Sequence, residues 1–341
     1  MDYKIDSHKL MYHPRRISDW LADKPIAPIY VEMSLSGMCN HHCIFCAMDF
    51  KRKPVKLRTE EIKSAIKNMS DLGIKSIMFG GEGEPFIHED IASIIEHTNK
   101  VGIDVAITTN GVLMKPSLLQ QILPNTKWIK VSMNAGSSKI YAHIHDTHRQ
   151  DFYTTIANIA AAIVIRNIYN YDCAIGIQAV VLEENVEELY SLALTAKSVG
   201  VDYLVLKPYA PLDLSGNKRN IVEIPESIVD SLRSLETSSF KIIVRENAFR
   251  TLTEHLPRGY DTCFAASFWS YIDSEGNVWA CSVHMNDNKF LLGNIYTDSA
   301  AKIWLTNRII PVNNCRVGCR MHQCNQYLHD LIYPRDHVNF I

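Results

Sequence analysis

Residues 38–46 read Met38-Cys39-Asn40-His41-His42-Cys43-Ile44-Phe45-Cys46 and place three cysteines in the spacing C-x3-C-x2-C. No fourth cysteine follows closely, because the next one along the chain is Cys173. A structural zinc ion is usually held by four protein ligands, and a [4Fe–4S] cluster is normally held by four thiolates. Three clustered thiolates therefore predict a cluster with one iron open to a ligand from outside the protein. The spacing alone leaves two alternatives, a zinc site completed by His41 or His42 and three thiols without a metal.

The composition indicates the size and the environment of the protein. Its 341 residues, of which 47% are apolar, suffice for one large domain with an appendage or for two domains. The net charge of −2 predicts no attraction to nucleic acid or to an acidic membrane. No apolar run is long enough to span a bilayer, and the N-terminal stretch lacks the apolar segment of a signal peptide. We therefore expect a cytoplasmic protein whose nine cysteines serve metal binding or catalysis rather than disulfides.

Strand-like and helix-like segments alternate between about residues 29 and 207. The expected strands are 29–35, 75–79, 103–108, 128–133, 174–182 and 203–207, and the expected helices are 59–72 (with Thr59 as N-cap), 87–100, 116–123, 151–165 and 186–199. The strands are nearly continuous apolar runs, as in a parallel sheet covered on both faces. Six such units are fewer than the eight of a closed TIM barrel, so the pattern predicts an α/β fold with a partial (β/α)6 barrel. The cysteine stretch then follows the first strand, at the carboxyl end of the sheet where such folds place their chemistry.

Three further polar stretches follow the next three strands. The first is Gly80-Gly81-Glu82-Gly83-Glu84-Pro85, whose glycines let a backbone approach a ligand closely. The second is Thr108-Thr109-Asn110-Gly111, and the third is Val131-Ser132-Met133-Asn134, in which Ser132 and Asn134 point the same way on an extended chain. Each stretch alone is also consistent with an ordinary turn after a strand. Their order behind consecutive strands predicts one binding site at this end of the barrel.

The cysteine stretch, with Phe45 before its last cysteine, resembles the signature of the radical S-adenosylmethionine (SAM) enzymes, and the polar stretches resemble that family's SAM-binding motifs. The resemblance implies a [4Fe–4S] cluster on Cys39, Cys43 and Cys46, with SAM on the open iron and reductive cleavage to a 5′-deoxyadenosyl radical. The residues that it implies for SAM binding are Phe45, Gly80, Gly81, Glu82, Asn110, Ser132, Asn134 and Gln178. Gly83-Glu84 is inserted relative to the family's Gly-Gly-Glu-Pro motif, and Glu82 is the expected participant of the two glutamates. The expected reductant is a flavodoxin or ferredoxin.

A second group of cysteines lies near the C-terminus. Cys263 and Cys281 flank a stretch, 268–280, that predicts a β-hairpin, and Cys315, Cys319 and Cys324 follow. This arrangement resembles the SPASM and twitch extensions of radical SAM enzymes, which hold auxiliary [4Fe–4S] clusters. It has fewer cysteines than the full SPASM pattern for two clusters, so the resemblance implies one auxiliary cluster. Cys263, Cys281, Cys315 and Cys319 form a complete ligand set with Cys324 as an alternate, and a zinc ribbon is the alternative reading.

These features divide the chain into four expected parts. They are an N-terminal extension (1–28), a radical SAM barrel (29–210), a linker with a bridging helix (211–257) and a SPASM/twitch-like auxiliary domain (258–341). The 38 residues before Cys39 are too few for the leader-recognition domain that many peptide-modifying relatives carry. The expected substrate is therefore a small polar, carbohydrate-like molecule. Lys207, at the end of the sixth strand, either faces the substrate or SAM or leaves the barrel for solvent.

The expected reaction is an oxidation or an epimerisation. Dehydrogenation requires a general base, for which His145 in the polar segment after the fourth strand is a candidate, and it passes an electron to the auxiliary cluster. Epimerisation requires a thiol that returns a hydrogen atom, and Cys173 or Cys324 is a candidate. Cys173 also reads as a small buried apolar residue. Two other functions stay open, a peptide- or protein-modifying radical SAM maturase and an iron–sulfur electron carrier or redox sensor that binds no SAM.

Overall fold

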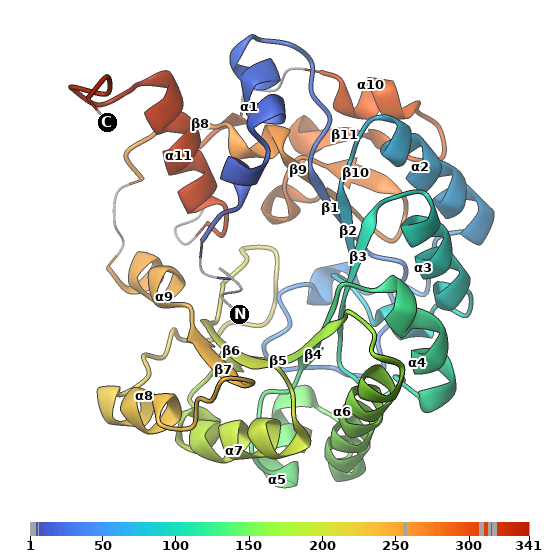
Figure 1. The fold of residues 1–341 in the computed structure, drawn as a ribbon, viewed down its shortest axis with the longest axis vertical. Helices are drawn as coiled ribbons and strands as arrows, with labels where there is room; N and C mark the ends of the chain where they lie inside the picture. Colours follow the sequence, from blue (N-terminus) through green and yellow to red (C-terminus); the bar gives the residue numbers. More distant parts are fainter. Residues whose placement is uncertain are drawn as a thin grey trace.

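The computed structural model describes residues 5, 7–254, 258–306, 310–312, 315 and 319–340. Its strands curve around a central space, and helices cover the outer face of the sheet (Figure 1). This arrangement confirms the expected mixed α/β fold with a parallel sheet. Within the described ranges, no helix combines the length and the apolar character that crossing a bilayer requires.

One ten-stranded sheet organises the molecule, in the order β11-β10-β9-β1-β2-β3-β4-β5-β6-β7. Its barrel strands are β1 (Tyr30–Met33), β2 (Ser76–Phe79), β3 (Asp104–Thr109), β4 (Trp128–Ser132), β5 (Ala174–Val181), β6 (Tyr203–Pro208) and β7 (Lys241–Val244). Each of these strands pairs in parallel with the next. The helices between them are α2 (Thr59–Asp71), α3 (Ile91–Lys100), α4 (Pro116–Ile122), α5 (Ser138–His145), α6 (Arg149–Tyr169), α7 (Leu189–Val199) and α8 (Glu226–Arg233).

The structure differs from the predicted pattern in three of these elements. Strand β7 lies inside the segment 211–257 expected to be a linker, and it extends the barrel sheet by one parallel strand. Helix α5 was expected to be an irregular polar segment, but Ser137 caps it by accepting a hydrogen bond from the Ile140 N–H. Helix α2 begins with Thr59 itself, and its N-cap residue is Arg58. The Thr59 hydroxyl instead donates to Asp90 Oδ2 at 2.6 Å.

The C-terminal domain continues the barrel sheet. The predicted hairpin forms from β9 (Trp269–Ile272) and β10 (Asn277–Trp279), and β9 pairs in parallel with β1. The remaining elements are β8 (Thr262–Cys263), β11 (Leu291–Asn294), β12 (Ile310–Pro311), α9 (Glu246–Thr253), α10 (Ala300–Trp304) and α11 (His322–Ile332). Helix α1 (Pro14–Leu21), in the expected N-terminal extension, packs Ile17 in one apolar cluster with Phe268 and Leu328. Helix α1 therefore packs on the C-terminal domain.

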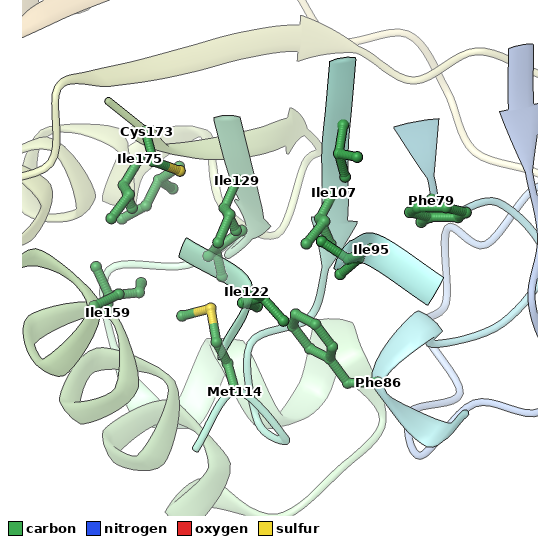
Figure 2. Packing of buried hydrophobic residues seen from close by; sticks show 14 of the residues in the cluster. Phe79, Phe86, Ile95, Ile107, Met114, Ile122, Ile129, Ile159, Cys173 and Ile175 are labelled. Carbon is green, nitrogen blue, oxygen red and sulfur yellow. The ribbon is translucent and has the colours of Figure 1, made fainter. Parts of the chain in front are cut away.

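The main apolar core fills the space between the sheet and its outer helices. Figure 2 shows Cys173 there, beside Ile129, Ile159 and Ile175, and its exposed fraction is 3%. Burial raises the pKa of the Cys173 thiol to about 12. Because Cys173 precedes β5, it lies at the amino end of the sheet, away from the carboxyl end that carries the cysteine stretch. This position contradicts its candidacy as a hydrogen-atom donor and agrees with the reading as a small buried apolar residue.

Candidate active site

The cysteine stretch lies in the loop after β1 and is fixed by backbone hydrogen bonds to α5. The His42 N–H donates to the His145 carbonyl at 3.1 Å, and the Ile44 N–H donates to the Ile144 carbonyl at 3.0 Å. Within the loop, the Cys46 N–H donates to the Cys43 carbonyl at 3.0 Å. These bonds hold the loop against α5. The unpredicted helix α5 is therefore part of the support of this site.

The three thiols of this loop are partly buried and lie near one another. Burial raises the pKa of the Cys39 thiol to about 11, and the Cys46 thiol contributes to that shift. Burial also raises the pKa of Cys43, and both other thiols raise it further. Three thiolates held this close repel each other unless a metal centre balances their charge. Three thiolates without a fourth cysteine ligand suit a [4Fe–4S] cluster that has one open iron.

The inserted Gly83-Glu84 pair supports the cysteine loop from below. The Glu84 N–H donates to the Met38 carbonyl at 2.8 Å. A side chain at Gly83 would collide with the carbonyl oxygens of Met38 and Ser36. The inserted glycine therefore has a packing role, since only glycine lets the turn after β2 approach the cysteine loop this closely.

We expect Gly83→Ala to displace the cysteine loop and to lower the iron content of the reconstituted enzyme to about half of the wild-type value or less. The added methyl group would meet backbone atoms, which cannot move without moving the loop. Gly102→Ala is the control, because Gly102 has a positive φ (+85°) that strains alanine but has no atom within 4 Å of an added Cβ. The control should lose stability, on the order of 1 kcal/mol, and keep its iron. Equal iron content in both variants would contradict this role of Gly83.

Glu84, and not Glu82, organises the Thr-Asn-Gly stretch after β3. Its carboxylate accepts hydrogen bonds from Thr109 Oγ1 at 2.6 Å and from the Asn110 N–H at 2.8 Å. Burial raises the pKa of Glu84 to about 7. The Asn110 side chain then donates to Asn40 Oδ1 at 2.7 Å. Asn110, predicted to contact SAM, thus contacts the cysteine loop directly.

Glu82 points away from the predicted SAM site and joins the barrel to the C-terminal domain. Its Oε2 accepts a hydrogen bond from the Ser274 N–H at 3.0 Å. Lys51, which is 3% exposed, lies between the two domains with Nζ 3.0 Å from Asp273 Oδ2 and 3.9 Å from Glu82 Oε1. The Trp279 indole N–H also donates to Asp273 Oδ2, at 2.9 Å. The structure thus gives the Glu82 side chain a contact between the two domains, and its part in binding SAM stays a prediction.

A cavity of about 510 Å³ opens inside the barrel. Five of the residues predicted to bind SAM line it, namely Phe45, Gly81, Ser132, Asn134 and Gln178. Gly80, Glu82 and Asn110 do not line it. The same cavity reaches Cys319 of the C-terminal cysteine group. It therefore connects the loop of the first cluster to the auxiliary domain.

His145 lies beside the cysteine loop and is fully buried, with an exposed fraction of 0%. Its Nδ1 is 3.4 Å from Cys43 Sγ. The other ring nitrogen, Nε2, faces the Asn134 backbone N–H at 3.3 Å and the Asn134 side-chain nitrogen at 3.2 Å. The Val180 N–H donates to Asn134 Oδ1 at 2.6 Å, which fixes the orientation of that amide. Two donors thus face Nε2, so the proton of the neutral ring is on Nδ1 and is directed at the Cys43 sulfur.

This geometry replaces the prediction that His145 is a general base. Burial lowers the pKa of His145 well below its ordinary value, and the ring lines no part of the cavity. A possible metal-ligand atom of His145 lies within 4.8 Å of those of His41 and Cys43. Among the described residues, these three form the one group of possible metal ligands at such distances. Both nitrogens of His145 already have hydrogen-bond partners, so it acts as a positioning residue for Cys43.

We expect His145→Leu to lower the midpoint potential of the first cluster by on the order of 50 mV, close to a tenfold change in a one-electron equilibrium. The reason is that an N–H donated to a cluster thiolate stabilises the reduced, more negative state. His145→Asn places an amide donor near the position of Nδ1 and should recover most of the shift. A redox titration followed by electron paramagnetic resonance measures both variants. An unchanged potential in His145→Leu with full iron content would contradict the hydrogen bond.

The five C-terminal cysteines form one group in the structure. Cys263 lies on β8, Cys281 follows β10 and Cys324 lies on α11. Burial raises the pKa of Cys263 to about 11 and of Cys281 and Cys324 to about 12, and the nearby Cys319 thiol raises each further. His284 Nε2 lies 3.1 Å from Cys315 Sγ. The group has the thiolates for an auxiliary cluster. Cys324 interacts electrostatically with Cys319 and Cys263 and does not line the cavity, so the structure does not support it as a hydrogen-atom donor to substrate.

Charged residues inside the barrel were the main part of the site that sequence patterns missed. Glu32, Lys130, Arg245 and Arg320 line the cavity, as does Lys207, whose orientation was left open. The alternation on β4 offered one signal, because Lys130 shares its face with Ser132 and with Asn134. No local pattern marks Glu32 or Arg245 as an interior residue.

Two family models match the chain. The radical SAM superfamily model matches residues 33–196, and the SPASM model, described as an iron–sulfur cluster-binding domain, matches residues 263–326. The chain belongs to the radical SAM superfamily and carries a C-terminal SPASM-type domain. The predicted cofactors follow from this membership: a [4Fe–4S] cluster with SAM and auxiliary iron–sulfur binding in the C-terminal domain.

Several known proteins are similar to the chain. The mycofactocin maturase MftC of Mycolicibacterium smegmatis is 24% identical over 287 residues, which cover 82% of this chain and 70% of MftC. A probable GTP 3′,8-cyclase of Methanothermobacter marburgensis is 39% identical over 89 residues, but the match spans only 29% of that protein. The structure of Streptococcus suis SuiB has a TM-score of 0.67 at 17% identity and covers 87% of this chain and 70% of SuiB. At that identity the likeness to SuiB shows a shared fold.

Proposed function

We propose that the chain is a peptide-modifying radical SAM maturase. The observation that carries the proposal is the cavity, which runs from Phe45 on the cysteine loop to Cys319 of the auxiliary group. When bound, SAM on the first cluster supplies a 5′-deoxyadenosyl radical that abstracts a hydrogen atom. A substrate in this cavity would lie between that chemistry and the auxiliary cysteines. Ser132 and Gln178, on neighbouring strands in register, would orient SAM at the cysteine end.

The comparisons support a peptide more than a carbohydrate-like substrate. MftC is named a maturase and aligns over most of this chain. SuiB has been solved with its precursor peptide SuiA, and anSMEcpe, with a TM-score of 0.56 at 20% identity, has been solved with a peptide. The expectation of a carbohydrate-like substrate depended on the short segment before Cys39, and the relatives favour the peptide alternative instead.

The test is anaerobic turnover of the reconstituted full-length enzyme with SAM, dithionite and synthetic peptides. The peptides are those encoded by short reading frames beside the gene, and a panel of aminocyclitols and nucleotide sugars serves as the competing substrate class. We expect one peptide to raise 5′-deoxyadenosine formation at least about tenfold over the substrate-free rate and to change in mass. Stimulation by a sugar and by none of the peptides would overturn the proposal.

A further inference from the structure

The charged side chains that line the cavity are four cations and one carboxylate, namely Lys130, Lys207, Arg245, Arg320 and Glu32. The carboxylate already has its partners. Glu32 Oε1 accepts from Arg320 Nη1 at 2.8 Å and from the Tyr30 hydroxyl at 2.8 Å. The Arg320 guanidinium also stacks 4.1 Å from the ring of Trp269. This pair balances its own charge and leaves the positive charges of Lys130, Lys207 and Arg245.

Neither Lys130 nor Lys207 forms an ion pair with a carboxylate in the part of the chain that the structure describes. The Lys130 ammonium lies 5.0 Å from the ring centroid of Trp128, a contact that does not neutralise it. Both lysines are half-buried, and a cation that has lost part of its hydration without gaining an anion is unfavourable. Burial, together with neighbouring cations, lowers the pKa of Lys207 to about 7, and burial lowers the pKa of Lys130 to about 8. A bound anion would balance the positive charge of both lysine side chains.

The strand register places the two lysines on either side of Gln178. Lys130 on β4 is in register with Gly176, two residues before Gln178 on β5. Lys207 on β6 is in register with Val180, two residues after it. All three side chains line the cavity. A ligand beside Gln178 therefore meets positive charge from both strands that flank β5.

We propose that Lys130 and Lys207 form a subsite for a carboxylate of the substrate. The peptide nature of this ligand rests on the proposed function, and the corresponding group is an aspartate or glutamate side chain or a terminal carboxylate. A carboxylate, with its single charge, fits two lysines in a cavity that also contains Glu32. A nucleoside triphosphate would also be attracted by these cations, so it is the competing class of ligand in the test.

The test uses SAM-loaded, reconstituted full-length enzyme and ligand-observed NMR. The probes are glutarate, the peptide N-acetyl-Ala-Glu-Ala-amide, its Gln counterpart and GTP. Glutarate reports on the subsite alone, whereas the peptide pair reports on the peptide claim. We expect glutarate and the Glu peptide to bind at least about tenfold more tightly than the Gln peptide. Lys207→Met and Lys130→Met should each remove this preference.

Lys67→Met is the matched control, because Lys67 is an exposed α2 residue that pairs with Asp71, and it should keep the preference. The Lys207 and Lys130 variants should melt at or above the wild-type temperature, since each removes a half-buried cation that forms no ion pair among the described residues. If glutarate binds but no peptide binds or is turned over, the carboxylate subsite is supported and only the proposed peptide function is overturned. Equal binding of all probes, tighter binding of GTP, or a loss of SAM affinity in the lysine variants would overturn the subsite.

Discussion

Cys43→Ala should abolish SAM cleavage, lowering 5′-deoxyadenosine formation at least about 1,000-fold. Cys43 is one of three thiols that the loop after β1 brings together, and no other cysteine of the described residues lies in that group. Losing one of three protein ligands leaves the cluster too weakly held to keep an open iron for SAM. The measurements are iron and sulfide content, electron paramagnetic resonance of the reduced protein and chromatography of 5′-deoxyadenosine.

Cys173→Ala is the control for this change. Cys173 is a cysteine in the apolar core, away from both cysteine groups, so the control should keep its iron content and its SAM cleavage. Substantial SAM cleavage by Cys43→Ala would contradict the assignment of the cluster to this loop. A loss of SAM cleavage in Cys173→Ala would contradict the assignment of Cys173 as a residue of the apolar core without a part in the reaction.

Cys281→Ala should remove the auxiliary cluster and lower substrate turnover at least about 100-fold. The Cys281 thiol interacts electrostatically with those of Cys319 and Cys263, so it belongs to the centre of the C-terminal group. The first cluster, in its own loop, should keep its spectroscopic signal. Mössbauer spectroscopy of iron-57 protein measures the two clusters separately.

The same experiment on Cys315→Ala and Cys324→Ala identifies the fourth ligand. The sequence favours Cys315, whereas in the structure the Cys324 thiol also interacts electrostatically with Cys319 and Cys263. The variant that loses the auxiliary signal marks the ligand. Full turnover by Cys281→Ala without its auxiliary cluster would contradict a part for this cluster in the reaction.

The cysteine motifs and the alternating strands could be predicted because their information is local. Cys39, Cys43 and Cys46 lie within eight residues, so their thiols stay close together in any fold of the surrounding chain. The apolar runs of β1 to β6 fix a parallel sheet in the same way. The hairpin of β9 and β10 could also be predicted from the sequence, because Asp273 to Gly276 are typical turn residues between two apolar runs.

The parts that sequence reasoning missed depend on contacts between distant segments. His145 is buried because α5 packs under the cysteine loop, a contact across more than a hundred residues. Glu82 and Glu84 are separated by one residue, yet one faces Ser274 and the other Thr109. Strand β7 is a four-residue run whose partner is β6, and nothing near it signals that pairing. Such assignments follow from tertiary packing and not from local pattern.

The most direct test of the account is deuterium transfer from a peptide to 5′-deoxyadenosine. The enzyme is incubated anaerobically with SAM, dithionite and uniformly deuterated peptides from the neighbouring reading frames, and the nucleoside product is analysed by mass spectrometry. We expect deuterium in 5′-deoxyadenosine with one of these peptides, and we expect Lys207→Met to lose this transfer. Unlabelled 5′-deoxyadenosine with every peptide, together with label from a deuterated sugar, would contradict the proposed function.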